Sequence, residues 1–285
     1  MQMRIEYKLK APLSHIGESA STGSYFQTVL TSAGKLPVVT ANSIRGQVRD
    51  AIAMHWLDLT GAKLDKDVFN IFFSGGNLNG TMKNDIAKAK AVREHFPGIS
   101  LLGGGLGDMI LAGKLICTMA YPVCKESEEI TGLQSNISWH SLIDEIEFTR
   151  TDDGKNELLD KYLIDPEADK TAKASTQMRF SVQYLSPGTE LVQDIIFLPG
   201  TTDLEVGAFL AGLAKWWQIP RMGGMAARGF GYFTARIDDG LLAVDDDGVQ
   251  ISNEVKKCID AYEELIRTEG AEYLDILAAS KKGKK

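Results

Sequence analysis

The sequence predicts an α+β protein with a ferredoxin-like or RRM-like core, in which strands and helices follow one another in the order βαββαβ. Residues near the N-terminus and at 230–237 alternate between apolar and polar, which is typical of half-buried strands. Two segments, 42–61 and 203–217, repeat apolar residues at helical spacing. A Ser-Pro-Gly turn at 186–188 separates two further strand-like runs. Without its insertions, the chain therefore has the βαββαβ order.

The chain begins with a predicted strand and a capped helix. The strand is expected over 4–10, and a loop of small polar residues follows at 14–23. Asn42 or Ser43 can cap the helix, which is expected to end near Gly61. Its apolar residues recur every four positions: Ile44, Val48, Ile52 and Trp56.

Two insertions are expected in this core. The first, 64–112, contains predicted helices at 64–74 and 82–96 and is followed by a strand through 115–121. In the second, about 123–175, the periodicity degrades and the acidity peaks. Both segments are therefore interpreted as additions to the core.

The second half of the chain supplies the remaining elements. Residues 178–185 and 191–198 are rich in β-branched and aromatic residues and are expected to pair as a hairpin. The core, or palm, then spans 1–237. The remainder, 238–285, is expected to form a C-terminal helical extension whose helix begins near Asn253.

The formal net charge of −7 argues, taken alone, against nucleic acid. The acidity is concentrated, however, with a net −6 over 144–170 and −5 over 238–285. The rest of the chain carries a net +4. The sequence therefore permits a basic groove on the remaining surface.

Cysteine usage and the N-terminus indicate a cytoplasmic protein. Cys117, Cys124 and Cys258 form no CxxC pair and leave one thiol over in any disulfide scheme, which fits a reducing compartment. The first residues lack an apolar run of signal-peptide length. No window reaches the roughly 18 apolar residues of a membrane span, so no membrane partner is expected.

No cofactor, metal or catalytic centre is expected. The glycine cluster at 103–107 lacks GxGxxG spacing, and no Ser or Thr follows Lys114 as in a P-loop. The four histidines have no His or Cys at metal-ligand spacing. His15 differs from the others because it lies in the small polar loop after the first strand, but no nucleophile accompanies it.

Two arginines lie four residues apart at the start of the first predicted helix. Arg45 and Arg49 share one face of that helix. Ser43 and the positive helix terminus would suit a phosphate that both guanidinium groups could grip. The structural alternative is a pair of solvated arginines on an amphipathic helix.

A second pair, Arg221 and Arg228, brackets a loop with almost no bulk. Met222, Gly223 and Gly224 open this loop, so backbone and guanidinium groups could approach a phosphate chain closely. The alternative is a plain connection between a helix and an edge strand. In an RRM-like plan both arginine pairs lie at helix–strand junctions around one sheet, which favours a shared groove along a nucleic-acid backbone.

In their order and spacing, three motifs resemble the RAMP backbone subunits of CRISPR effector complexes, the Cas seven family. They are His15-Ile-Gly17 after the first strand, the helix start at 41–49, and the glycine-rich segment 222–231. The resemblance covers most of 1–237. It implies an RNA-binding scaffold without catalysis, whose copies stack in a helical filament along the crRNA spacer, beside other effector subunits, so that the guide pairs with target DNA or RNA.

The resemblance also implies roles for particular residues. The inserted thumb that reaches over the next subunit is expected at about 123–175, with 64–112 as a rival. The residues expected to contact the guide RNA are His15, Ser43, Arg45, Arg49, Arg221, Met222, Gly223, Gly224 and Arg228.

Two other functions stay open. RNA-cleaving type III members carry an aspartate between the first strand and the first helix, whereas residues 17–42 contain Glu18 and no Asp. This departure favours a type IV or type I backbone over the first alternative, a metal-dependent endoribonuclease using Glu18 and His15. The second alternative is a monomeric RRM-like module that binds single-stranded RNA.

Overall fold

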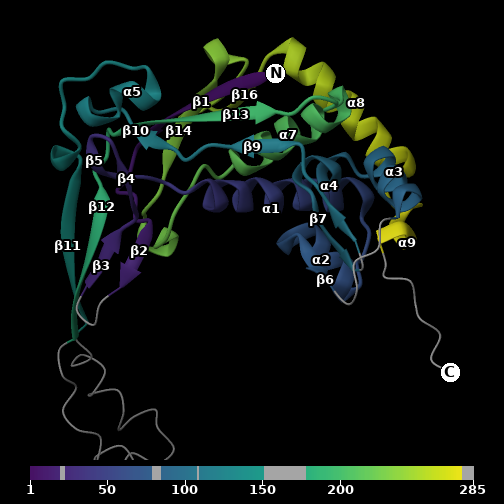
Figure 1. Cartoon of the computed structure of the whole chain (residues 1–285), viewed down its shortest axis with the longest axis horizontal. Helices are drawn as coiled ribbons and strands as arrows, with labels where there is room; N and C mark the ends of the chain where they lie inside the picture. Colours follow the sequence, from purple (N-terminus) through teal and green to yellow (C-terminus); the bar gives the residue numbers. More distant parts are fainter. Residues whose placement is uncertain (20–22, 79–84, 108, 151–177, 278–285) are drawn as a thin grey trace, which may run out of the picture.

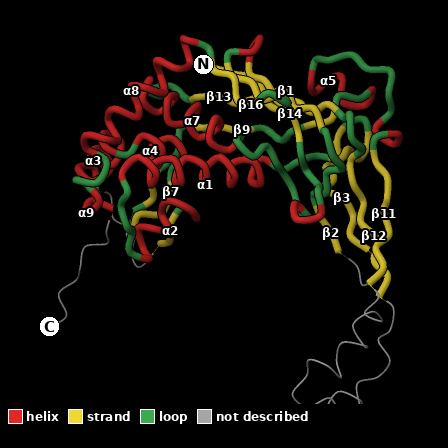
Figure 2. Tube along the Cα trace, turned by 180° about the vertical axis from the view of Figure 1, so that it is seen from behind, coloured by secondary structure: helices red, strands yellow, loops and turns green. Residues whose placement is uncertain are grey.

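The computed structural model describes residues 1–19, 23–78, 85–107, 109–150 and 178–277, and the statements below concern these residues. They form an arch (Figure 1). A large sheet and its helices make the span, and one limb consists of long strands (Figure 2). The other limb is built mainly from short helices and strands.

A seven-stranded antiparallel sheet forms the span, with the N-terminal strand β1 (Gln2–Leu9) in its interior. The other strands are, in spatial order, β10 (Tyr121–Pro122), β13 (Glu190–Phe197), then beyond β1, β14 (Phe233–Ile237), β15 (Leu242–Asp245) and β16 (Gly248–Ile251). β9 (Leu115–Cys117) also pairs with β13.

Helices α1 (Ala41–Thr60) and α7 (Asp203–Trp216) pack against each other beneath this sheet, and α8 (Asn253–Glu269) packs on α7. The apolar spacing predicted for α1 is confirmed, because Ile44, Val48, Ile52 and Trp56 are all buried. Each such side chain contributes about 1.5–3 kcal/mol when it leaves water. The apolar stripe therefore fixes which face of α1 is buried.

The order β1–α1–β9–β13–α7–β14 is the predicted βαββαβ core, and it confirms the α+β fold class. The predicted hairpin between 178–185 and 191–198 is wrong. Strand β12 (Met178–Leu185) pairs with β11 (Ile143–Arg150) and β3 (Gly23–Phe26) in a second sheet. The three-residue strand β9 pairs with β13 instead, so the turn after β12 joins two sheets rather than two paired strands.

The strand limb is the sheet β11–β12–β3–β2, where β2 spans Ile16–Ser19. The hairpin of β4 (Thr28–Thr31) and β5 (Gly34–Pro37) lies beside it. In the segment expected as the thumb, 123–142 folds with the short helix α5 (Glu128–Thr131), and β11 begins the long hairpin. Residues 151–177 lie outside the described residues.

The helical limb is formed mainly by residues 64–112, the segment that the sequence predicts to be an insertion. Its helices are α2 (Lys66–Ser74), α3 (Ile86–His95) and α4 (Pro97–Leu102). Its small sheet consists of β6 (Gly76–Leu78), β7 (Gly104–Gly107) and β8 (Ile110–Leu111). The two predicted helices are confirmed within a few residues, and the C-terminal turn α9 (Leu274–Leu277) contacts α3.

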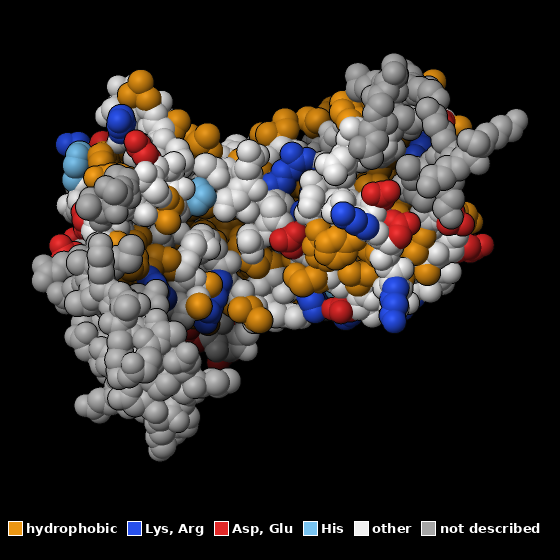
Figure 3. Space-filling model, turned by 90° about the horizontal axis from the view of Figure 1, so that it is seen from below, with side chains coloured by type: hydrophobic (Ala, Val, Ile, Leu, Met, Phe, Trp, Pro, Cys, Tyr) orange, Lys and Arg blue, Asp and Glu red, His pale blue; other side chains and the backbone are white. Residues whose placement is uncertain are grey.

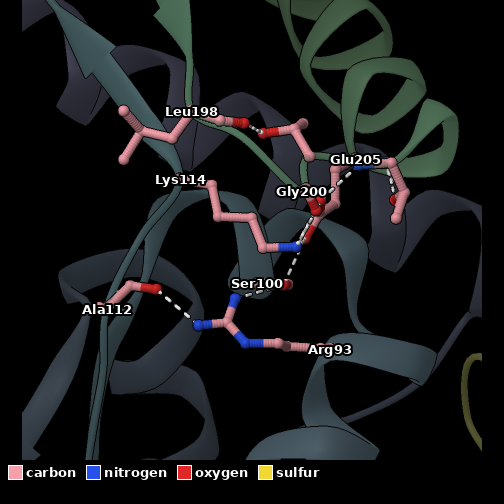
Figure 4. A network of polar contacts seen from close by, with 9 residues as sticks. Arg93, Ser100, Ala112, Lys114, Leu198, Gly200 and Glu205 are labelled. Carbon is pink, nitrogen blue, oxygen red and sulfur yellow. Dashed lines mark hydrogen bonds and ion pairs between the residues drawn. The ribbon is translucent and has the colours of Figure 1, made fainter.

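A buried carboxylate attaches this insertion to the core (Figure 4). Glu205 on α7 is 1% exposed, and it accepts hydrogen bonds from the Ser100 hydroxyl and from Lys114 Nζ at 2.9 Å. Arg93 of α3 donates to Ser100 Oγ at 3.1 Å. Because every partner is a donor, the charge of Glu205 is satisfied without water.

The C-terminal extension differs in its first part from the expected helical segment. Residues 238–251 include the strands β15 and β16, which widen the main sheet, before α8 starts at Asn253 as predicted. Ser252 caps α8 through its side chain. Within the described ranges, no helix is long and apolar enough to cross a membrane.

Candidate nucleic-acid interface

The glycine loop, defined here as residues 221–231, is held by the loop that follows β1. The Gly224 N–H donates to Ser14 O at 2.7 Å, and the Gly231 N–H donates to Pro12 O at 2.8 Å. Gly223 has φ +74°, and a Cβ there would lie 2.3 Å from Ser14 O. Close packing against Ser14 therefore requires glycine at position 223 whatever the loop binds.

The two arginines of the glycine loop are exposed and differ in their contacts. Arg221 Nη1 donates to Ala226 O at 3.0 Å and so braces the 3₁₀ turn Ala226–Arg228. The guanidinium of Arg228 lies 4.8 Å from the ring centroid of Phe148 and 5.2 Å from that of Phe180. Both side chains leave N–H groups over for a ligand, since a guanidinium carries five.

The backbone of the glycine loop offers less to a ligand than its sequence suggests. The side chain of Met222 is 3% exposed and belongs to the core, and its N–H donates to Gly231 O at 3.0 Å. The N–H groups of Gly224 and Arg228 are also bonded within the protein. These three backbone N–H groups are therefore not open to a ligand, whereas both arginine side chains are.

His15 connects the same region to the start of α1. Its Nε2 accepts a hydrogen bond from the Thr40 N–H at 3.1 Å, and the Gln27 N–H donates to His15 O at 2.7 Å. Burial lowers the pKa of His15. The imidazole is therefore neutral near pH 7, with its proton on Nδ1.

The cap of α1 is Thr40, which precedes the expected Asn42 by two residues and the alternative Ser43 by three. Thr40 Oγ1 accepts a hydrogen bond from the Ser43 N–H at 3.4 Å. Ser43 thus lies inside the first turn, and its N–H already has a partner. The cap thus occupies the N–H of Ser43, and the Ile44 N–H donates to Thr40 O at 3.3 Å, so neither of these groups is open to an anion.

Arg45 and Arg49 do share a face of α1, but they point toward the helical limb. Arg45 donates to Leu102 O, and Arg49 donates to Gly103 O at 3.0 Å and weakly to Ile71 O. These carbonyls lie in or just after α4 and near the end of α2, where helices lack internal donors. The pair therefore fastens the insertion to α1.

The electrostatics of this pair still favour an anion. Burial, with the nearby Arg45, lowers the pKa of Arg49 to about 10. Arg45 Nε is buried without a hydrogen-bond partner, and no carboxylate of the described residues lies within 4.0 Å of either guanidinium. Their hydrogen bonds go only to carbonyls, and the nearby Asp50 offsets part of the charge of Arg49.

Hydrogen bonds thus bring His15, the start of α1 and the glycine loop together, whereas Arg45 and Arg49 bind the other limb. Sequence reasoning missed Ser14 and Thr40, which make these connections, and the aromatic pair beneath Arg228. Alternation of Ile146 and Phe148 in an acidic segment was the available signal for the strand that carries this pair. On the underside of the arch, basic side chains are interspersed with acidic and apolar ones (Figure 3).

The family model described as the RAMP superfamily matches residues 6–234. The chain belongs to the RAMP superfamily. A comparison with curated proteins finds no match. Among solved structures, a chain of a "Type IV-B CRISPR Complex" shares the fold, with a TM-score of 0.61 and 16% sequence identity, over 84% of this chain and 90% of that one.

The match confirms the family that the three sequence motifs indicate, and it spans the predicted palm with both insertions. Within the described part of this RAMP protein, no group of three or more His, Cys, Asp or Glu side chains is arranged to hold a metal ion.

Proposed function

We propose that this RAMP protein is a backbone subunit of a CRISPR ribonucleoprotein effector complex. Copies would assemble along the crRNA spacer with other effector subunits and hold the guide phosphates, while base pairing with the guide selects the target DNA or RNA. The observation that carries the proposal is the convergence of the glycine loop, the loop after β1 and the start of α1, with Arg221 and Arg228 exposed on it. The fold shared with a chain of a type IV-B complex supports it.

The open face of the main sheet argues against the monomeric RRM-like alternative. Side chains on this face form ion pairs between strands: Arg4 with Asp194 at 2.9 Å, Arg236 with Glu6 at 2.6 Å and Lys8 with Glu190 at 3.4 Å. RRM domains instead stack bases on aromatic side chains of this face. The aromatic residues of the described central strands β1, β13 and β14 are buried: Tyr7, Phe197 and Phe233.

The proposal is tested by RNA binding to the full chain over a salt series. Arg221→Ala and Arg228→Ala are each expected to weaken binding and to reduce the slope of log K against log salt by about 0.7, the value for one phosphate contact on a single strand. Lys8→Ala is the matched control, since it removes an exposed cation from the open face of the main sheet, which α1 and α7 do not cover. Wild-type binding that is absent or insensitive to salt would refute the proposal.

The type III-like endoribonuclease is distinguished in a second assay. Guide-complementary RNA is incubated with the assembled complex and Mg²⁺. Cleavage at regular intervals would show that the subunit is an endoribonuclease and would refute the proposal of a purely binding subunit. Uncut target is the result expected of a binding subunit.

Arg45 and Arg49 require a different design, because both hold carbonyls of the helical limb. Loss of either side chain changes stability as well as charge. Their proposed contact with the guide is therefore tested only in variants whose unfolding has been measured first, with Arg49→Lys retaining the charge but not the paired hydrogen bonds.

A further inference from the structure

An arginine of the glycine loop is stacked on two aromatic rings of the strand limb. Phe148 of β11 and Phe180 of β12 are directly opposite in the antiparallel ladder, and their ring centroids lie 5.3 Å apart at an interplanar angle of 24°. The Arg228 guanidinium lies over both rings, at 4.8 and 5.2 Å. Residues 32 and more positions apart in sequence thus form one cluster.

The same segment makes a second aromatic contact with the hairpin. Phe230, two residues after Arg228, is 5% exposed, and its ring lies 6.4 Å from Phe148 and 6.2 Å from Tyr184. Tyr184 in turn donates to Asp144 of β11 at 3.3 Å. The end of the glycine loop is therefore packed against the β11–β12 hairpin over two successive contacts.

Stacking fixes the direction of a guanidinium without using its hydrogen-bond donors. The guanidinium carbon of Arg228 lies over both rings, which have no oxygen or nitrogen to accept its N–H groups, so these donors remain available to a ligand. No ion pair is recorded between Arg228 and a carboxylate of the described chain. The exposed cation is therefore oriented by apolar groups while its charge stays uncompensated.

We propose that Phe148 and Phe180 are positioning residues for RNA binding, which aim the Arg228 guanidinium at a phosphate of the bound strand. The inference rests on the proposed function and names residues outside the glycine loop that act on it. Because the rings belong to the hairpin, a phosphate that holds Arg228 also favours the docked hairpin. By thermodynamic linkage, the factor by which bound RNA stabilises the docked hairpin equals the factor by which the docked hairpin raises the affinity for RNA.

A double-mutant cycle tests this coupling, with labelled oligouridylate as the probe and the full chain as the binder. Phe148→Leu is expected to weaken binding by about 2- to 5-fold, the range of an exposed cation–π contact. In the Arg228→Ala background the same substitution is expected to have no further effect, because Phe148 acts through Arg228. Phe148→Tyr keeps an aromatic ring at this position and is expected to bind RNA with wild-type affinity.

Phe69→Leu is the matched control. Phe69 is 47% exposed and stacks on Phe73 at 4.4 Å, but it belongs to α2 on the opposite limb. It is expected to leave affinity unchanged. Thermal unfolding of each variant separates loss of the phosphate contact from loss of the fold, and Phe180→Leu repeats the test from the other strand.

Three results decide the matter. Equal losses from Phe148→Leu with and without Arg228 would overturn the inference, because the ring would then act on the fold alone. An Arg228→Ala variant that binds as well as wild type would also overturn the inference. The proposed function would then still stand, with RNA bound by other residues. Failure of the wild-type chain to bind RNA would refute the proposed function itself.

Discussion

Gly223 and Gly229 provide a test of how the glycine loop is built. Both have left-handed backbones, with φ +74° and +81°. A methyl group at Gly229 would meet open space, whereas at Gly223 it would lie 2.3 Å from Ser14 O and 2.7 Å from Leu13 Cδ1. Alanine at the two positions therefore imposes similar backbone strain but very different crowding.

The expected costs follow from these contacts. Gly229→Ala carries the left-handed strain alone, about 1–2 kcal/mol. At Gly223 the methyl carbon would lie 2.3 Å from Ser14 O, which is 0.7 Å less than the 3.0 Å below which Cβ contacts essentially do not occur in proteins. The Ser14 carbonyl must therefore move. That movement breaks its 2.7 Å hydrogen bond with the Gly224 N–H, and leaving these groups unsatisfied adds about 1–3 kcal/mol.

Urea unfolding of wild type and both variants measures the difference. We expect Gly223→Ala to lower the free energy of unfolding by about 3 kcal/mol and Gly229→Ala by about half as much. Equal losses would show that the approach of Ser14 does not determine the loop, and the reasoning from the Cβ distance would be wrong.

Three further changes address other parts of the molecule. Burial lowers the pKa of His15, so on acidification the unfolded chain binds a proton at a higher pH than the folded chain does. The free energy of unfolding should therefore fall as the pH drops through about 6.5. His15→Gln should reduce this pH dependence, as measured by unfolding curves at several pH values. Lys114→Met leaves the buried Glu205 carboxylate without its cation and should cost about 3–5 kcal/mol in urea unfolding. Thr202→Ala, which removes the cap of α7, should cost about 1 kcal/mol in the same assay.

The helices and the fold class were predictable because their signals are local. The spacing of apolar residues in α1 predicts its buried face, and the mainly apolar sequence of α7 is typical of a helix that is buried on nearly all sides. The second strand of the core was assigned wrongly because 178–185 has the stronger strand pattern. Its partners, β11 and β3, are distant in sequence, and no local feature distinguishes the two sheets.

The candidate site was predictable in residue type more than in role. Arg221 and Arg228, which the sequence places on either side of a loop with almost no bulk, are exposed in the structure. It could not indicate that Met222 is buried or that Arg45 and Arg49 bind carbonyls of α4, because those partners come from an insertion more than 50 positions away. Helix ends that need donors attract arginines for the same physical reason as phosphates do.

The segment 12–15 explains how separate motifs become one surface. Pro12 O and Ser14 O accept hydrogen bonds from the glycine loop, and Leu13 exchanges two backbone hydrogen bonds with Leu185 of β12, at 2.9 and 2.8 Å. His15 then accepts from Thr40 at the start of α1. Four successive residues thus contact the glycine loop, the strand limb and helix α1. The glycine loop is therefore joined to the β11–β12 hairpin by two sets of contacts, the backbone hydrogen bonds of 12–15 and the aromatic rings beneath Arg228.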